Sequence, residues 1–286
     1  MQFADLPYIE RNRLYNLYTS GADLYPVSVE RGWKLASLER RLREFGARQV
    51  TESPKPKLDK PPTIGDCLIL ADPHIPYHDA TFINRCIDVA LSMGIKECCV
   101  AGDLLDYNAF SPFDPNVSDT LEAEYAAAED FLGVLAGAFQ SVLRIKGNHD
   151  ARLDKRIGYH QLSADRARRI LTDKPNVVFS DYYHCLCNGW RICHPKNASV
   201  VPGSVAAKLA GKYSCNVVAG HGHVFGVAQD ISAQYIGIDS GACADPARIE
   251  YVEMRMNTRP RIYQGAVVLK DGMPTLINKA FDVRLK

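Results

Sequence analysis

The chain has 286 residues, of which 47% are hydrophobic and 23% charged, and its formal net charge is +1. This composition is typical of a globular protein, and so small a charge excludes a global attraction to nucleic acid or membranes, so that any such binding must come from a local patch. No apolar run is long enough to cross a bilayer, and no signal-peptide pattern opens the sequence, so we expect no membrane partner. The nine cysteines lie mostly in apolar runs, which predicts reduced thiols in a cytoplasmic protein.

The first fifty residues are predicted to form a small all-α domain. Apolar residues recur at helical spacing up to Ser20-Gly21, and two further helices are predicted over 27–33 and 37–45 with a short turn between them. Four basic residues lie in that turn or on the last helix: Lys34, Arg40, Arg41 and Arg43. The arrangement resembles a helix-turn-helix unit in which these side chains bind DNA. The alternative is a helical lid or dimer element whose arginines are simply solvated.

Residues 50–62 are predicted to be a linker. Four prolines alternate there with polar residues, and the segment contains almost nothing to bury. The sequence therefore predicts a helical domain over 1–49, a linker over 50–62 and a second domain over 63–286.

In the second domain, short apolar runs alternate with segments of helical periodicity. The expected strands cover 65–71, 97–101, 141–145, 190–193, 216–219 and a hairpin over 266–277. The expected helices cover 79–93 and 120–139. A β-α-β-α-β order gives a parallel sheet whose ligands bind at the carboxyl ends of its strands. We expect an α/β fold, a four-layer α/β/β/α sandwich of two facing sheets flanked by helices.

Polar motifs follow these strands at the ends where ligands are expected. In chain order they are Asp72-Pro73-His74, Gly102-Asp103-Leu104-Leu105-Asp106, Gly147-Asn148-His149-Asp150, His194 and Gly220-His221-Gly222-His223. Each motif alone could be an ordinary turn or a structural histidine, but five of the eight histidines fall in these positions. Aspartate oxygens, an asparagine carbonyl and imidazole nitrogens together suit two first-row divalent metals that share a carboxylate.

The order and content of these motifs resemble the calcineurin-like metallophosphoesterases over residues 63–286. The run Gly-Asn-His-Asp-Ala-Arg-Leu at 147–153 resembles a bacterial and phage branch of that family. The resemblance implies hydrolysis of a phosphate ester by a hydroxide that bridges two divalent ions, with Mn²⁺ expected and Fe, Zn, Ni or Mg as alternatives. It implies Asp72, His74 and His223 as ligands of one ion, Asn148, His194 and His221 as ligands of the other, and Asp103 as the bridge.

The resemblance also implies roles for residues that are not ligands. His149 would face the leaving group and stabilise or protonate it, and Asp106 would accept a hydrogen bond from the other ring nitrogen, with Asp150 as an alternative orienter. Arg152 would contact a phosphate oxygen, as would Asn148, or Arg152 would merely brace the loop. Tyr107 follows Asp106 where protein serine/threonine phosphatases have arginine, which disfavours that subfamily.

Three functions stay open at this point. The first is a phosphodiesterase or nuclease that acts on duplex or single-stranded DNA. The second is a small-molecule phosphatase or nucleotide phosphodiesterase, cyclic nucleotides included, with the N-terminal helices as lid or dimer element. The third is a non-catalytic DNA-binding or scaffold protein, against which the complete ligand set and His149 argue. The oligomeric state and the native metal are not determined by the sequence.

Overall fold

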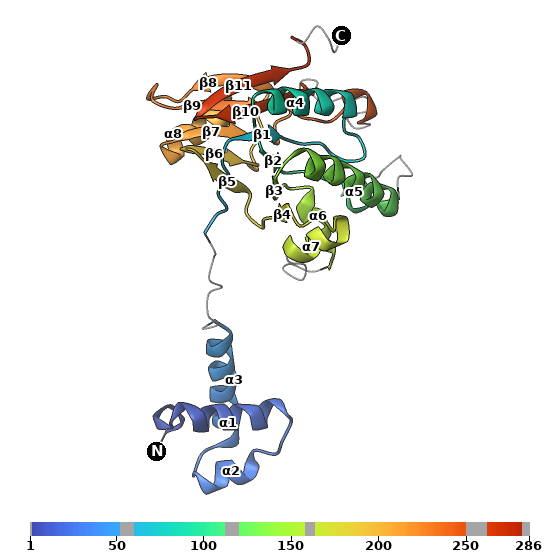
Figure 1. The fold of residues 1–286 in the computed structure, drawn as a ribbon. Coiled ribbons are helices and arrows are strands. Elements are labelled where there is room, and N and C mark those ends of the chain that lie inside the picture. Colours follow the sequence, from blue (N-terminus) through green and yellow to red (C-terminus); the bar gives the residue numbers. More distant parts are fainter. Residues whose placement is uncertain (1, 52–59, 112–119, 158–163, 250–261, 282–286) are drawn as a thin grey trace. The chain divides into compact units, whose positions relative to one another are not determined.

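The computed structural model describes residues 2–51, 60–111, 120–157, 164–249 and 262–281. The chain divides into two compact units, Met1–Asp59 and Lys60–Lys286, here called the N-terminal unit and the larger unit (Figure 1). Among the described residues, the helices are all too short or too polar to span a membrane.

The N-terminal unit is a bundle of helices around one small core. Its elements are a 3₁₀ turn Phe3–Asp5, α1 (Tyr8–Thr19), α2 (Tyr25–Glu30) and α3 (Leu35–Thr51). Leu38, Leu42 and Phe45 form one stripe along α3, and this stripe is buried together with Phe3, Leu6, Leu14 and Leu24. Apolar residues at helical spacing thus bury one face of α3 and leave the opposite face to solvent.

Two helix boundaries in this unit differ from the predicted ones. The helix predicted over 27–33 is α2, which begins at Tyr25 because Pro26 fits the first helical turn, and which ends early because Gly32 adopts φ +66. The next helix begins at Leu35 and continues through Thr51, into the stretch predicted as linker. Residues 52–59 of that stretch lie outside the described residues.

The larger unit contains two β-sheets. The strands of the six-stranded sheet are, in spatial order, β11 (Met273–Asn278), β10 (Gly265–Lys270), β1 (Cys67–Leu70), β2 (Glu97–Ala101), β3 (Ser141–Ile145) and β4 (Val177–Phe179). Those of the five-stranded sheet are β5 (His184–Cys187), β6 (Trp190–Cys193), β7 (Asn216–Ala219), β9 (Ile236–Ser240) and β8 (Phe225–Gln229). The strands β1 to β4 run parallel, as do β6, β7 and β9, so that the carboxyl ends of each parallel set meet at one edge.

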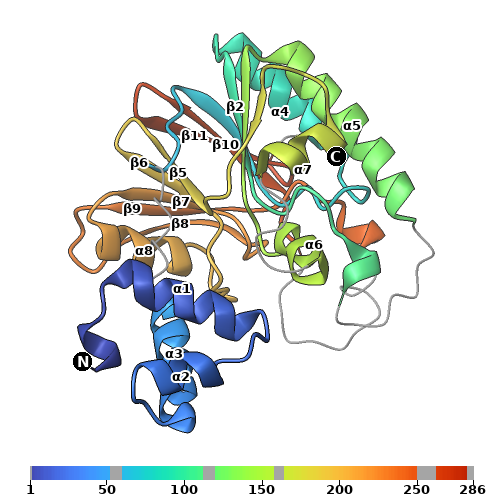
Figure 2. The same ribbon diagram turned by 90° about the horizontal axis from the view of Figure 1, so that it is seen from below.

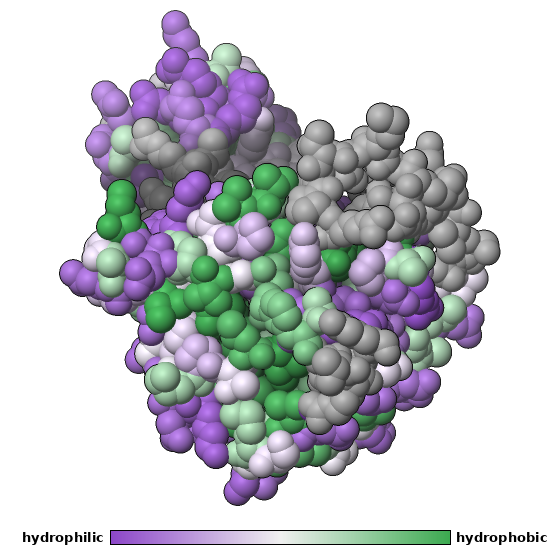
Figure 3. All heavy atoms as spheres, turned by 90° about the horizontal axis from the view of Figure 1, so that it is seen from above, coloured by the Kyte–Doolittle hydropathy of each residue, from purple (hydrophilic) through white to green (hydrophobic). Residues whose placement is uncertain are grey.

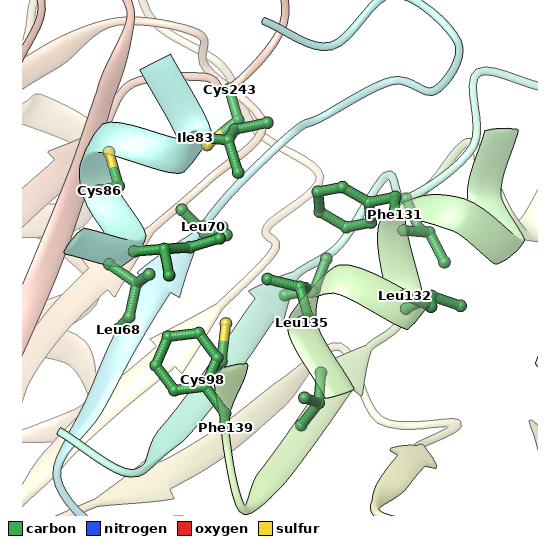
Figure 4. Close-up of a cluster of buried hydrophobic side chains, with 14 of the residues drawn as sticks. Leu68, Leu70, Ile83, Cys86, Cys98, Phe131, Leu132, Leu135, Phe139 and Cys243 are labelled. Atoms are coloured by element: carbon green, nitrogen blue, oxygen red, sulfur yellow. The ribbon is translucent and has the colours of Figure 1, made fainter. Parts of the chain in front are cut away.

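Helices cover the outer face of each sheet. Those of the larger unit are α4 (Ala80–Ser92), α5 (Leu121–Ala138), α6 (Asp150–Ile157), α7 (Ala164–Leu171) and α8 (Ser204–Tyr213). α4, α5 and α7 contact the six-stranded sheet, whereas α8 contacts β7 and β9 of the other sheet (Figures 1 and 2). In Figure 4, Leu70 of β1 lies between Ile83 of α4 and Leu135 of α5, and Cys98 of β2 lies beside Phe139 at the end of α5. The predicted four-layer α/β/β/α fold is confirmed.

A second core fills the space between the two sheets. Ile69, Ile145 and Ile192 are buried there. The same core contains four thiols, called here the inter-sheet thiols: Cys67, Cys99, Cys185 and Cys187. The Sγ atoms of Cys99 and Cys185, from different sheets, are 3.7 Å apart. Hydrogen bonding to Cys185 and burial raise the pKa of Cys99, and all nine cysteines are free thiols.

Asp79 joins the start of α4 to the C-terminal end of the described chain. Its Oδ1 atom accepts the N-cap hydrogen bond from Phe82 N at 2.9 Å, and its Oδ2 atom pairs with Lys279 Nζ and Gln264 Nε2. Burial works against ionisation, but the bonds from Lys279 and Phe82 outweigh it and lower the pKa of Asp79. This ion pair is independent of the polar motifs.

The face of the larger unit that is uppermost in Figure 1 carries exposed apolar side chains. Figure 3 looks onto this side and shows hydrophobic residues gathered in the middle of it. β8 and β11 each form the edge of a sheet, with Val227 50% exposed on β8 and Leu276 41% exposed on β11. Edge strands of this kind are the positions at which a sheet can pair with another chain.

Candidate metal centre

The loops that follow β1, β2, β3, β6 and β7 bring the polar motifs together. Histidines and aspartates from these loops form three overlapping groups, and within each group the ligand atoms lie within 4.8 Å of one another. The groups are Asp72, His74 and His223; His74, Asp103 and His149; and Asp103, His194 and His221. Residues separated by as many as 151 positions thus meet, because the carboxyl ends of the parallel strands of both sheets lie together.

The first group places three potential ligand atoms against one another. The Nε2 atoms of His74 and His223 are 3.0 Å apart, and Asp72 Oδ1 is 3.3 Å from His223 Nε2. Asp72 and His74 are fully buried, and Asp72 Oδ1 has no hydrogen-bond partner among the described residues. A buried carboxylate oxygen without a donor is costly, which indicates that a cation belongs there.

Asp103 is shared between the groups. Its Oδ2 atom is 3.3 Å from His194 Nε2 and 3.8 Å from His74 Nε2, while its Oδ1 atom accepts a hydrogen bond from His149 N at 2.7 Å. Asn148 Oδ1 lies 3.0 Å from His194 Nε2, so this predicted ligand also reaches the centre. One oxygen of Asp103, Oδ2, therefore lies near members of both predicted ligand sets.

Outer contacts fix the orientation of two of the imidazoles. His74 Nδ1 is 2.9 Å from Asp106 Oδ1, and His194 Nδ1 is 3.0 Å from the carbonyl oxygen of Ala101. Because a carbonyl or carboxylate oxygen accepts, the proton of each ring belongs on Nδ1 and the Nε2 lone pair faces the other ligands. This is how metal-binding histidines are usually held.

The donor set fits divalent metal ions. Burial lowers the pKa of His194, but the carboxylates of Asp103 and Asp72 outweigh burial and raise it to about 10, so the centre favours a positive charge. Mixed imidazole and carboxylate ligands are those of Mn, Fe, Zn and Ni rather than of a thiolate site.

Five of the predicted ligands have a strained backbone. Their φ angles are positive although none is glycine: Asp72 (52°), His74 (46°), Asp103 (48°), His221 (72°) and His223 (53°). Non-glycine residues rarely adopt this region, and such conformations persist where surrounding contacts over-determine them, most often at functional sites. The loops are indeed tied together, because His74 N donates to the Asp103 carbonyl at 3.1 Å.

Glycines in the motifs allow the loops to approach closely. A Cβ atom at Gly147 would collide with the backbone nitrogen and Oδ1 of Asp103, and one at Gly220 would lie 2.8 Å from Asp72 Oδ2. Gly222 differs, because a Cβ there would meet only Val224 Cγ2, at an ordinary 3.4 Å. Gly147 is thus required by the position of Asp103, whereas Gly222 is not.

We expect Gly147→Ala to weaken metal binding by displacing Asp103, with a reduction of roughly 10- to 100-fold, as for other changes that disturb ligand orientation. Equilibrium dialysis with Mn²⁺ measures this reduction. Gly222→Ala is the matched control in the neighbouring motif and should bind metal like the wild type. Equal metal affinity in both variants would contradict the close-approach argument.

His149 lies at the rim of the centre. Its Nδ1 atom is 2.9 Å from the Asp106 carbonyl oxygen, and its Nε2 atom is 4.0 Å from Asp103 Oδ2. Burial lowers the pKa of His149, but the charges of Asp103 and Asp106 outweigh burial and raise it. A proton-transfer group beside the predicted ligands is consistent with the predicted role.

Asp106 and Arg152 make more contacts than predicted. Asp106 Oδ1 lies 3.1 Å from His149 Nδ1 as well as beside His74, so one carboxylate contacts both rings. Arg152 donates from Nη1 to the Asp106 carbonyl at 2.7 Å, and its Nη2 lies 3.0 Å from His149 Nε2. The bracing alternative for Arg152 is thus present in the structure, and its contact with phosphate stays a prediction.

Three buried residues hold the loops in ways that the sequence did not reveal. The alternative prediction, that Asp150 orients the His149 ring, is not what the structure shows. The Oδ2 atom of Asp150 instead accepts hydrogen bonds from the backbone nitrogens of Asp103 and Gly147, at 3.1 and 2.7 Å. Glu124, fully buried on α5, accepts at 3.1 Å from the backbone nitrogens of the two residues after Asp106. Arg144 of β3 pairs with Asp150. Arg144 is the one charged residue in the apolar run of β3, which was the only signal in the sequence, whereas Glu124 shares α5 with Glu122, Glu129 and Asp130 and had none.

The four basic residues predicted to bind DNA lie in two places on the N-terminal unit. Arg40 and Arg43 are exposed on α3, where the Arg40 side chain is 65% exposed and its Nε is 4.0 Å from Glu44. Lys34 and Arg41 instead line a shallow pocket with Trp33.

No protein-family model matches the sequence, and no curated protein matches it either. Among solved structures, the chain is similar to an archaeal phosphodiesterase (14% identity, 74% of this chain and 99% of that chain, TM-score 0.40). It is also similar to the phosphoesterase YfcE from E. coli (14% identity, 74% and 92%, TM-score 0.41) and to vacuolar protein sorting 29 from Cryptosporidium parvum (16% identity, 74% and 94%, TM-score 0.37). Likeness this distant says nothing of activity, which has to be inferred from the site itself.

Proposed function

We propose that this protein is a metal-dependent phosphoester hydrolase that holds two divalent ions on either side of Asp103. The observation that carries the proposal is the sharing of Asp103 between ligand groups, with Oδ2 within 3.8 Å of imidazole nitrogens from both sides. Asp72, His74 and His223 would hold one ion. Asn148, His194 and His221 would hold the other.

Divalent ions bound there would polarise a phosphate ester and acidify water near neutral pH. The protein's own part is to place groups around the reacting phosphorus. Asp106 keeps the Nε2 lone pair of His74 directed inward, because it binds the opposite nitrogen. His149 would give a proton to a leaving oxygen from Nε2 once Arg152, whose Nη2 lies 3.0 Å from that atom, turns to the substrate, since Nδ1 is engaged by Asp106. Arg152, already beside His149 Nε2, is placed to meet a charged substrate.

We further propose that the substrate is DNA and that the N-terminal unit binds it. Arg40 and Arg43 support this proposal, because both are exposed on one helix that follows a short turn after α2, as in helix-turn-helix units. Lys34 and Arg41 beside Trp33 add positive charge next to an aromatic ring. The near-neutral net charge of the chain makes such a local patch necessary for DNA binding.

The test is turnover by the Mn²⁺-loaded protein on a panel of esters. The panel contains p-nitrophenyl phosphate, its bis ester, cyclic nucleotides, single-stranded DNA and duplex DNA. We expect hydrolysis of the bis ester and of DNA, and none after chelation. Turnover of cyclic nucleotides but not DNA would support the small-substrate alternative. No turnover of any ester, with metal bound, would favour a non-catalytic protein.

DNA binding by the full chain should fall steeply with salt concentration. We expect Arg40→Ala combined with Arg43→Ala to lower the log–log salt slope by about one for each phosphate group that the variant no longer neutralises. A gel-shift series at several salt concentrations measures the slope. Arg13→Ala is the matched control, because Arg13 is an exposed arginine of the same unit on α1, with its side chain 73% exposed.

Removal of residues 1–59 separates the two alternatives. The DNA proposal expects the remaining larger unit to lose DNA cleavage and to keep turnover of the chromogenic ester, since every predicted ligand lies beyond residue 59. The lid or dimer alternative expects altered turnover of small esters instead. Absence of DNA binding by the full chain at low salt would refute the helix-turn-helix interpretation.

A further inference from the structure

We propose that Arg144 and Asp150 are positioning residues that fix the direction of the Asp103 carboxylate. Asp150 Oδ2 accepts two backbone hydrogen bonds, from Asp103 N at 3.1 Å and from Gly147 N at 2.7 Å. One carboxylate oxygen therefore ties the loop after β2 to the loop after β3. The consequence for metal binding rests on the proposed function, whereas the loop contacts do not.

Asp150 requires a buried cation, and Arg144 supplies it. The Asp150 side chain is fully buried, and its Oδ1 atom lies 2.8 Å from Arg144 Nη2, itself only 6% exposed. A buried carboxylate without a partner would turn toward water, and that change would disturb its hydrogen bonds. The guanidinium of Arg144 therefore holds Asp150 Oδ1 in place.

The fold explains why an arginine interrupts an apolar strand. Leu143 and Ile145 of β3 point into the core between the sheets, so Arg144 between them points to the opposite face, toward the helices. There its guanidinium carbon lies 4.7 Å from the centre of the Phe179 ring on β4. Ring and carboxylate together fix the guanidinium, so the pair is a rigid support rather than a mobile surface contact.

The contacts of Asp150 also determine the position of Asp103 Oδ2, the oxygen that the proposed function uses. Asp103 has φ +48, a conformation that lasts only if neighbouring contacts maintain it. Asp150 holds the backbone nitrogen of Asp103, and His149 N holds its Oδ1 atom at 2.7 Å. With both anchors in place, Oδ2 is the oxygen that faces His194 and His74.

The test uses Arg144→Gln in the full chain, with Lys279→Gln as a matched control. Like the test variant, the control removes the cationic partner of a carboxylate. This carboxylate is that of Asp79, which is not part of the polar motifs. Amide hydrogen exchange is measured at Asp103 and Gly147 in metal-free protein, and Mn²⁺ affinity by equilibrium dialysis. We expect faster exchange at both amides and an affinity about 10- to 100-fold weaker in Arg144→Gln alone. Arg144→Lys, which keeps the charge, should recover part of the affinity.

Each outcome decides the proposal. Exchange at Asp103 and Gly147 that is unchanged in Arg144→Gln would overturn it, and so would an equal drop in affinity in Lys279→Gln. If Arg144→Gln does not fold, the wild type is decisive, because both amides must exchange slowly although they lie outside helices and strand pairing. A wild type that binds no Mn²⁺ but shows the expected exchange would refute the proposed function and leave the positioning role standing.

Discussion

Asp103→Asn is expected to remove most phosphoesterase activity and to weaken metal binding by at least about 100-fold, beyond the 10- to 100-fold typical of changes outside the ligand shell. The neutral amide keeps the size of the side chain, and its oxygen can still accept the hydrogen bond from His149 N. The charge on Oδ2 disappears, and this atom is the one that faces His74 and His194. Metal content by elemental analysis and turnover of a phosphodiester measure the two effects.

Asp230→Asn provides the control for this change. Asp230 is also buried, at 7% exposed, and accepts backbone hydrogen bonds within the turn between β8 and β9. Its substitution should alter stability without altering metal content. Full turnover by chelated, metal-free wild type would refute the metal-dependent mechanism, whatever the result for Asp103→Asn.

His149→Ala is expected to keep the metals and to slow hydrolysis by roughly 10²- to 10⁴-fold, the usual contribution of a positioned proton donor. Its ring nitrogens contact Asp106 and Arg152, which are not predicted ligands, while the ring packs edge-on against His74 with the centroids 4.5 Å apart. The reduction should be smaller for esters of p-nitrophenol, whose leaving oxygen needs no proton. Rates on a series of esters with different leaving groups, at equal metal content, measure this dependence.

His184→Ala removes a histidine of β5 that has no place in the metal centre and should leave the rates unchanged. Loss of metal from His149→Ala would mean that His149 is a ligand, because it lies within 4.8 Å of potential ligand atoms of His74 and Asp103. A drop in rate independent of the leaving group would also contradict the proton-donor role.

Where an apolar run ends at a polar motif, the first and last residues of the strand could be predicted correctly. β2 and β3 are largely apolar runs that end at a motif, and their bounds are those expected. β8 and β9 were not predicted, because β8 is half-exposed along its length and β9 contains glycine and aspartate, so neither shows a clean alternation. The predicted boundaries of α2 are wrong, because they follow apolar spacing alone and not the signals of Pro26 and Gly32.

The residues of the candidate site also fall into those that could be predicted from the sequence and those that could not. The ligand candidates could be found because each stands shortly after a strand, and the carboxyl ends of the parallel strands of both sheets then bring them together. The residues that hold the loops could not be found, since Glu124 and Arg144 act on partners that are remote in sequence or fixed by tertiary packing. Asp150 stands inside a predicted motif, yet its partners are backbone nitrogens, which no sequence pattern records.

The inter-sheet thiols can be used to detect separation of the two sheets. Cys67 and Cys99 on one sheet and Cys185 and Cys187 on the other are all at most 1% exposed, so an alkylating reagent reaches them only when the layers separate. Pulsed alkylation followed by mass spectrometry would therefore time the parting of the sheets without any engineered probe. Cys215 is partly exposed and should react first, which supplies an internal standard for the reagent.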